Sequence, residues 1–137
     1  MSFDVFLNFD GDCREAVAFY CEVFQVNVTG EMMTYGQNPS ASPVDQDRIL
    51  YASLPVFGSN FMMSDCPSDA QFVKGNNVSL TLGSADPAEI TRIFQALAAG
   101  GTAVMPLQKT FFSELFGMVC DKFGIHWQLA LSPEQAA

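Results

Sequence analysis

The sequence has little positive charge. Lys and Arg together number 6, against 15 Asp and Glu, and the formal net charge is −9 at pH 7. The basic residues are scattered along the chain rather than gathered in one segment: Arg14, Arg48, Lys74, Arg92, Lys109 and Lys122. Because such a chain repels phosphate backbones, we expect no nucleic-acid partner, and the same scarcity of basic residues argues against a polyanionic ligand.

The sequence also lacks the segments that place a protein in a membrane. No apolar run approaches the roughly 18 residues of a membrane-spanning helix, and Asp4 interrupts any apolar leader segment. The four cysteines, Cys13, Cys21, Cys66 and Cys120, show neither CxxC nor metal-finger spacing. We therefore expect reduced thiols in a cytoplasmic protein that makes no contact with a membrane.

What the sequence does contain is an internal repeat. Residues 78–82 alternate between apolar and polar side chains, and Val5, Leu7 and Phe9 recur at the same period of two, as in strands with one buried face. Asp12 follows the first segment and Asp86 the second, and each stands where an N-cap begins an amphipathic helical pattern. The sequence therefore predicts two similar modules.

Three predicted strands follow each predicted helix. They cover residues 26–35, 49–55 and 60–64 in the first copy, and residues 102–107, 116–121 and 125–131 in the second. With 49% hydrophobic residues, including 13 Phe, the chain can bury a core without disulfides. The order βαβββ, present twice, predicts an α+β fold.

Three segments resemble a known family. Residues 6–16 (FLNFDGDCREA), 61–65 (FMMSD) and 116–127 (FGMVCDKFGIHW) are similar to the signatures of PhnB-like proteins in the vicinal oxygen chelate superfamily. That superfamily also includes glyoxalase I, bleomycin-resistance proteins and extradiol dioxygenases.

The resemblance implies one domain, residues 1–137, built from module 1 (about residues 1–66) and module 2 (about residues 76–132). Two such βαβββ modules form a cupped, mostly antiparallel sheet with helices on its convex side. The resemblance further implies a homodimer with an open cavity.

In metal-using relatives, the first and last strands of each module give one ligand apiece. By position these ligands correspond here to Asp4, Asn77, Gln128 and either Met62 or Met63. Two amides and a thioether do not replace the carboxylate oxygens and imidazole nitrogens that divalent ions prefer. We therefore expect no metal ligand. We expect no cofactor either, since the chain has no glycine-rich strand-to-helix loop for a nucleotide-like group, although some relatives carry ubiquinone-methyltransferase names.

The single histidine, His126, shares a strand face with Gln128. A hydrogen-bonded, metal-free imidazole at a cavity wall is favoured over a weak ion site shared with Asp65. If the last hairpin closes over residues 121–124, Cys120 lies opposite Ile125 and faces the helix layer, away from His126. This register argues against a Cys/His pair, and Cys13 is expected to be an ordinary exposed cysteine.

Strand parity places Phe6, Asn77, Ser79, His126 and Gln128 on the cavity side. The family resemblance adds Tyr51, at a position where many relatives carry His, and Phe112, in a loop where relatives often carry Trp; with the apolar Met63 these residues complete the expected ligand-binding set. The candidates for acid or base chemistry are Asp4, Asp65, Glu114 and His126. Against such a role, Asp65 has the alternative of capping a turn toward Pro67, and Glu114 that of standing in solvent. For Phe111 and Phe112, periodicity does not separate a pocket from the core.

The favoured hypothesis is a metal-independent protein that binds a small, partly apolar molecule. The alternative is a metal-dependent glyoxalase or dioxygenase-type lyase, isomerase or oxygenase, which would carry stoichiometric Ni, Fe, Mn or Zn. A third possibility is a structural dimerisation module, whose concave face its own side chains would fill. The sequence leaves the ligand and the pathway open.

Overall fold

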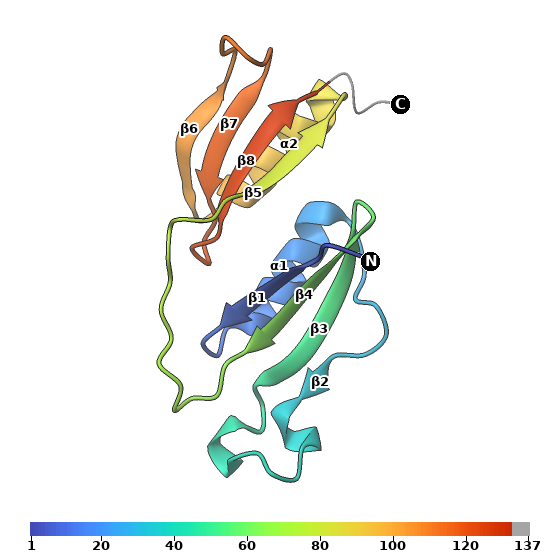
Figure 1. The fold of residues 1–137 in the computed structure, drawn as a ribbon, viewed down its shortest axis with the longest axis vertical. Coiled ribbons are helices and arrows are strands. Elements are labelled where there is room, and N and C mark those ends of the chain that lie inside the picture. Colours follow the sequence, from blue (N-terminus) through green and yellow to red (C-terminus); the bar gives the residue numbers. More distant parts are fainter. Residues whose placement is uncertain (133–137) are drawn as a thin grey trace. The chain divides into compact units, whose positions relative to one another are not determined.

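The computed structural model of the protein describes residues 1–132 (Figure 1), so the last part of the predicted domain, residues 133–137, lies outside the described residues. The chain forms two compact units, the first spanning Met1–Val73 and the second beginning at Lys74. This boundary lies in the segment that was predicted to join the two modules. We describe each unit by itself.

The first unit is a four-stranded sheet with one helix. Its elements are β1 (Val5–Phe9), α1 (Cys13–Phe24), β2 (Met33–Thr34), β3 (Ile49–Val56) and β4 (Ser59–Asp65), with short 3-10 turns η1 (Tyr35–Gln37) and η2 (Pro43–Asp45). The strands lie in the order β1-β4-β3-β2. The pair β1 and β4 is parallel, and the other neighbours are antiparallel.

The second unit repeats this topology. Its elements are β5 (Leu80–Ser84), α2 (Pro87–Ala98), β6 (Thr102–Gln108), β7 (Phe116–Cys120) and β8 (His126–Leu131). The strands lie in the order β5-β8-β7-β6, again with a parallel pair, β5 and β8, at one edge. The predicted α+β fold with two βαβββ modules is therefore confirmed. No helix among residues 1–132 is long and apolar enough to span a membrane.

Two predicted elements differ from the structure. The strand expected over residues 26–35 is reduced to β2, because Gly30 adopts a left-handed conformation (φ 68°) and the preceding loop bonds through the Thr29 N–H to the Ser53 carbonyl. Val78 was expected to face the helix, but it precedes β5 and is 68% exposed. Leu80 and Leu82, which keep the predicted parity, pair with buried residues of β8.

In the first unit, α1 covers one face of the sheet (Figure 1), and aromatic contacts identify that face. Tyr20 and Phe24 of α1 lie 5.1 and 6.0 Å from the Phe61 ring, measured between centroids. Phe61 pairs with Leu54, and Met63 with Ala52, so these four buried side chains share the face that α1 covers. We call the opposite face of each sheet its helix-free face.

In the second unit, α2 covers the face that carries Val119, Trp127 and Leu129, all of them buried. Trp127 is 2% exposed, so its ring belongs to the core beneath α2. Gly117 lies on the same face, where an added Cβ would come within 2.7 Å of Phe94 Cε2 on α2. The helix therefore packs closely on β7.

The two helices begin in different ways. Asp86 caps α2 as predicted, because its carboxylate accepts a hydrogen bond from the Ala88 N–H at 2.9 Å. The side chain of Asp12 makes no such bond to α1. The cap comes instead from Asp65 at the end of β4, whose Oδ1 accepts from the Gly11 and Cys13 N–H groups at 2.8 and 3.0 Å. Its Oδ2 accepts from the Ile49 N–H at 2.9 Å.

This geometry predicts that Asp65→Ala lowers the free energy of unfolding by about 3 kcal/mol, because it leaves three N–H donors without their charged acceptor in a buried site. Urea denaturation measures the change. The matched control is Asp12→Ala, which should cost less than about 0.5 kcal/mol. Equal losses for the two variants would contradict the assignment of the cap to Asp65.

Candidate functional site

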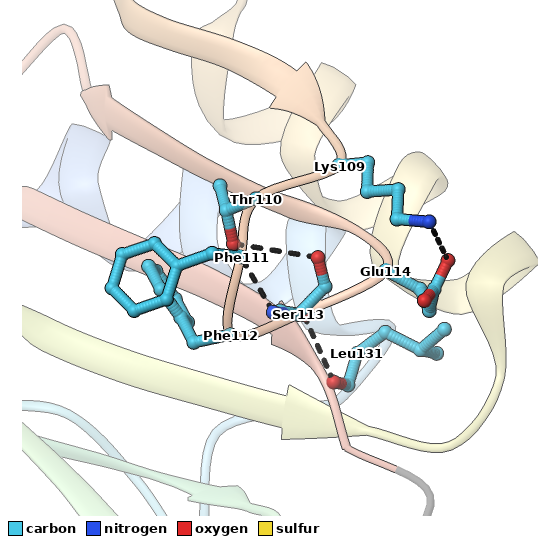
Figure 2. Close-up of a pocket in the computed structure, with 7 residues that line it drawn as sticks. All are labelled: Lys109, Thr110, Phe111, Phe112, Ser113, Glu114 and Leu131. Carbon is cyan, nitrogen blue, oxygen red and sulfur yellow. Dashed lines mark hydrogen bonds and ion pairs between the residues drawn. The ribbon is translucent and has the colours of Figure 1, made fainter.

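A hollow of about 320 Å³ lies in the second unit at the loop between β6 and β7 (Figure 2). It is lined by Lys109, Thr110, Phe111, Phe112, Ser113, Glu114 and Leu131. We call it the Phe112 hollow. Its volume is at the lower end of the range for small-molecule pockets, which indicates a ligand of modest size.

Two phenylalanines give the hollow an aromatic wall, and a third, Phe116, supports Phe112 from β7. The Phe111 and Phe112 rings are perpendicular with centroids 5.2 Å apart, and Phe112 meets Phe116 of β7 edge-on at 5.0 Å. Phe111 is fully exposed and Phe112 is 59% exposed, whereas Phe116 is buried beneath them. Exposed aromatic side chains of this kind present apolar area that a ligand removes from water. For these two residues the structure favours a surface pocket over the core.

Polar groups of the loop hold the hollow in shape. Thr110 and Ser113 are joined by bonds between their backbone groups and through the Thr110 hydroxyl, and the Ser113 hydroxyl donates to the carbonyls of Leu115 and Leu131. The Lys109 ammonium lies 3.5 Å from the Glu114 carboxylate, with both side chains 72% exposed. An ion pair this exposed adds little stability, so both groups are able to turn to a ligand.

The helix-free face of the second sheet carries two predicted residues, His126 and Gln128, on β8. Opposite them on β7 lie Cys120 and Met118, respectively, and Ala130 is opposite Phe116. The predicted register was wrong by one residue, because Cys120 pairs with His126 and not with Ile125. The two side chains therefore share a face, with Cys120 Sγ 4.0 Å from His126 Nε2.

The reason for the shift is the turn between β7 and β8. Asp121 and Ile125 are joined by a backbone hydrogen bond, and the Gly124 N–H donates to the Asp121 carbonyl, so only three residues form the loop. Gly124 has φ 83°, as the last residue of a three-residue hairpin loop requires. Gly124 in this position is the sequence signal for the correct register. With that register, Cys120 lies beside His126, a neighbour that the sequence analysis did not predict.

In the first unit, two predicted binding residues lie together on the helix-free face. The Phe6 and Tyr51 rings are 6.4 Å apart, and Phe6 is 46% exposed. Met63 was placed in the same set, but it lies on the face that α1 covers and has no exposed area. The thioether beside Phe6 belongs to Met62, its partner in the β1–β4 ladder. The expected position of Met63 is wrong by one residue, because successive side chains of β4 point to opposite faces.

The carboxylates proposed for acid or base chemistry occupy different environments. Asp65 was expected near a cavity rim, but it is 1% exposed, and its two oxygens are engaged by the three backbone donors described above. It caps α1 rather than the turn toward Pro67. Asp4 precedes β1, where the Ser2 hydroxyl and the Asn60 N–H donate to its carboxylate and lower its pKa. Of these four candidates, only Glu114 lines the Phe112 hollow and only His126 lies on a helix-free face.

Asn77 and Ser79 both precede β5 and are exposed. The side chain that pairs with Gln128 on the helix-free face is Thr81. The positions that correspond to metal ligands in relatives carry the amides of Asn77 and Gln128, a methionine thioether and the Asp4 carboxylate. This donor set does not fit a divalent ion. Among residues 1–132, no three His, Cys, Asp or Glu side chains gather as a metal-binding cluster.

The cysteine environments also differ from those expected. Cys13 was expected to be exposed, but it has no exposed area. Burial, and then the nearby Asp65 charge, raises the pKa of its thiol to about 12. Burial also raises the pKa of Cys21 and of Cys66, each of which is partly exposed.

Comparison with known proteins places the chain in a family. Protein YjdN of Escherichia coli is 34% identical over 146 residues, with 98% of both chains covered. The crystal structure of protein PA1353 from Pseudomonas aeruginosa has a TM-score of 0.88 at 32% identity and covers 96% of this chain and 98% of its own. A Bacillus cereus structure described as a putative 3-demethylubiquinone-9 3-methyltransferase, PhnB protein, has a TM-score of 0.81 at 30% identity, with 96% and 100% covered.

The fold is also shared with more distant proteins. The fosfomycin resistance protein FosX of Listeria monocytogenes has a TM-score of 0.65 at 9% identity, a likeness in fold alone, with 95% and 91% covered. The predicted PhnB-like identity within the vicinal oxygen chelate superfamily is confirmed. Residues 2–130 match the family described as 3-demethylubiquinone-9 3-methyltransferase, and the chain belongs to this family.

The burial of Cys13 predicts that this thiol does not react with a disulfide reagent such as DTNB at pH 8 while the protein is folded. A thiol with a pKa of about 12 is ionised to only about 1 part in 10,000 at that pH. Urea should expose it, and mass spectrometry of digested protein identifies the labelled residue. Cys21 and Cys66 serve as internal controls, and labelling of folded Cys13 at their rate would contradict the burial.

Proposed function

We propose that this protein binds a small, partly apolar molecule without the help of a metal ion. The aromatic wall of the Phe112 hollow is the observation that carries the proposal. Phe111 and Phe112 present exposed rings above Phe116, and the Lys109–Glu114 pair adds two charged groups at the rim. Such a combination of apolar wall and few polar groups favours a ligand with an aromatic part and one or two polar atoms.

Metal independence is supported by the chemistry of the side chains. Gln128 and Met62 stand on the helix-free faces at positions that correspond to ligands in metal-using relatives, and neither is a good ligand for a hard or borderline ion. The family's description names a methyltransferase. Neither strand-to-helix connection, residues 10–12 and 85–86, has the glycine-rich sequence that a nucleotide-like methyl donor favours.

The proposal extends to assembly and location. We expect a homodimer, as the family resemblance implies, in the cytoplasm, where four free thiols are stable. Size-exclusion chromatography with light scattering tests the first expectation, and fractionation of cells tests the second.

Elemental analysis of the purified protein tests metal independence. We expect Ni, Fe, Mn and Zn to be far below stoichiometric amounts, and dialysis against a chelator to leave the unfolding midpoint unchanged. A stoichiometric ion whose removal lowers the midpoint would favour the metal-dependent lyase, isomerase or oxygenase instead.

A panel of neutral aromatic ketones and phenols, with 4-phenylbutan-2-one among them, tests the hollow. A ligand at 100 times its dissociation constant should stabilise the protein by about 2.7 kcal/mol, which a thermal-shift assay detects. Phe112→Ala should weaken its binding about tenfold, because the ligand loses its aromatic contact. Phe3→Ala, which alters an exposed ring in the first unit, is the matched control. Binding that is equal in the two variants, or absent for the whole panel, would contradict the proposal.

A further inference from the structure

The thiol of Cys120 and the imidazole of His126 form a pair that neither the family resemblance nor the proposed binding role explains. They occupy directly opposed positions on β7 and β8, and Sγ lies 4.0 Å from Nε2. Both side chains are partly exposed on the helix-free face of the second sheet. A nucleophile and a base within hydrogen-bond reach are the two components of an activated thiol.

The thiol hydrogen has two acceptors within reach. One is the Asp121 carbonyl, 3.8 Å from Sγ, and the other is His126 Nε2. A backbone carbonyl only accepts the hydrogen bond, whereas an imidazole with its hydrogen on Nδ1 is able to take the proton itself. His126 is therefore the group that makes Cys120 different from a simple hydrogen-bonded thiol.

The remaining cysteines lack this arrangement. His126 is the only histidine of the chain, so no other thiol has an imidazole beside it. Cys13 is buried, and burial raises the pKa of Cys21 and of Cys66. These three thiols provide internal standards for the reactivity of Cys120.

A continuous row of side chains leads from the Phe112 hollow to this pair. On β7, Phe116, Met118 and Cys120 alternate along the helix-free face, and their partners on β8 are Ala130, Gln128 and His126. Four residues of a strand cover about 13 Å. The row is thus aromatic at the end where Phe112 covers Phe116, carries a thioether and an amide in the middle, and ends at the thiol and imidazole.

We propose that Cys120, with His126 as its base, adds to small molecules in which an aromatic or apolar group is joined to a carbon–carbon double bond conjugated with a carbonyl. The row of side chains sets this class, because its apolar end suits the ring and its sulfur end suits a soft electrophilic carbon. The proposal deepens the proposed function and rests on it for the apolar contact.

The reaction balances without an added reagent. The Cys120 proton passes to His126 Nε2 as Sγ forms a bond to the β-carbon of the conjugated alkene. The π-electron pair of the double bond moves to the α-carbon as an enolate, which then takes the proton back from His126. The product is a thioether between Cys120 and the saturated carbonyl compound, and His126 returns to its starting state.

The test uses the full chain and the aryl enone 4-phenylbut-3-en-2-one. After timed incubation, borohydride reduction fixes the adducts, and mass spectrometry of the digest gives the rate at each cysteine. We expect Cys120 to react at least about tenfold faster than Cys21 or Cys66, and H126Q to remove this advantage, since base assistance supplies a factor of roughly 100 or more. C120S should abolish the fast phase.

Unchanged rates at Cys21 and Cys66 show that H126Q remains folded, as does unchanged fluorescence of Trp127, the only tryptophan. If H126Q does not fold, comparison of the cysteines within the native chain decides the matter. Similar rates at Cys120, Cys21 and Cys66, or a fast Cys120 that H126Q does not slow, would overturn the inference.

The saturated ketone 4-phenylbutan-2-one separates this inference from the proposed function. Binding of this ketone without selective reaction at Cys120 would overturn the inference and leave the proposed function standing. Selective, His126-dependent reaction without binding of the ketone would support the thiol–imidazole pair and overturn the apolar site. Competition between the ketone and the enone at Cys120 is the result that supports both.

Discussion

The carboxylate of Asp121 determines how β8 lies against β7, and the helix-free face of the second unit depends on it. Its Oδ1 accepts hydrogen bonds from the Phe123 and Ile125 N–H groups at 2.9 and 3.1 Å. Its Oδ2 accepts from Trp127 Nε1 at 2.9 Å. One side chain thus holds both the turn and the first core residue after it. A side-chain period of two means that a slip of one residue would turn every residue of β8 to the other face.

A buried carboxylate plays a comparable part in the first unit, but with partners that are far apart in the sequence. Asp65 joins the end of β4 to the beginning of α1 and to the first residue of β3. The second unit has no need of such a group, because Asp86 caps α2 locally. The repeat therefore preserves the topology and not the means of stabilising it. The buried carboxylates of Asp65 and Asp121 are engaged by backbone and indole N–H groups, which leaves chemistry to the side chains on the helix-free faces.

The sequence predicted the order of elements because that order follows from local patterns. Alternation gives β5 and β8, and the Asp86–Pro87 helix start gives α2 within a residue. The register of the last hairpin was missed although Gly124 signals it locally, whereas other errors arose where a distant group decides the outcome. Asp65 buries Cys13 at the beginning of α1, and the first unit's core takes Met63 in place of Met62. Periodicity identifies which residues share a face, but it does not tell which of two apolar neighbours faces the helix.

The size of the Phe112 hollow limits what non-covalent binding achieves. Burial of apolar surface contributes only about 25 cal/mol per Å², and the loss of translational and rotational freedom on association offsets part of that gain, so a hollow of this size alone gives weak binding. A protein that retains its ligand at low concentrations therefore needs a further interaction, and the helix-free face offers one in the sulfur of Cys120. Because Cys120 and Phe116 are on the same strand, a single rigid element fixes the spacing between the aromatic contact and the thiol. Ligand length, as well as polarity, is then a criterion for recognition.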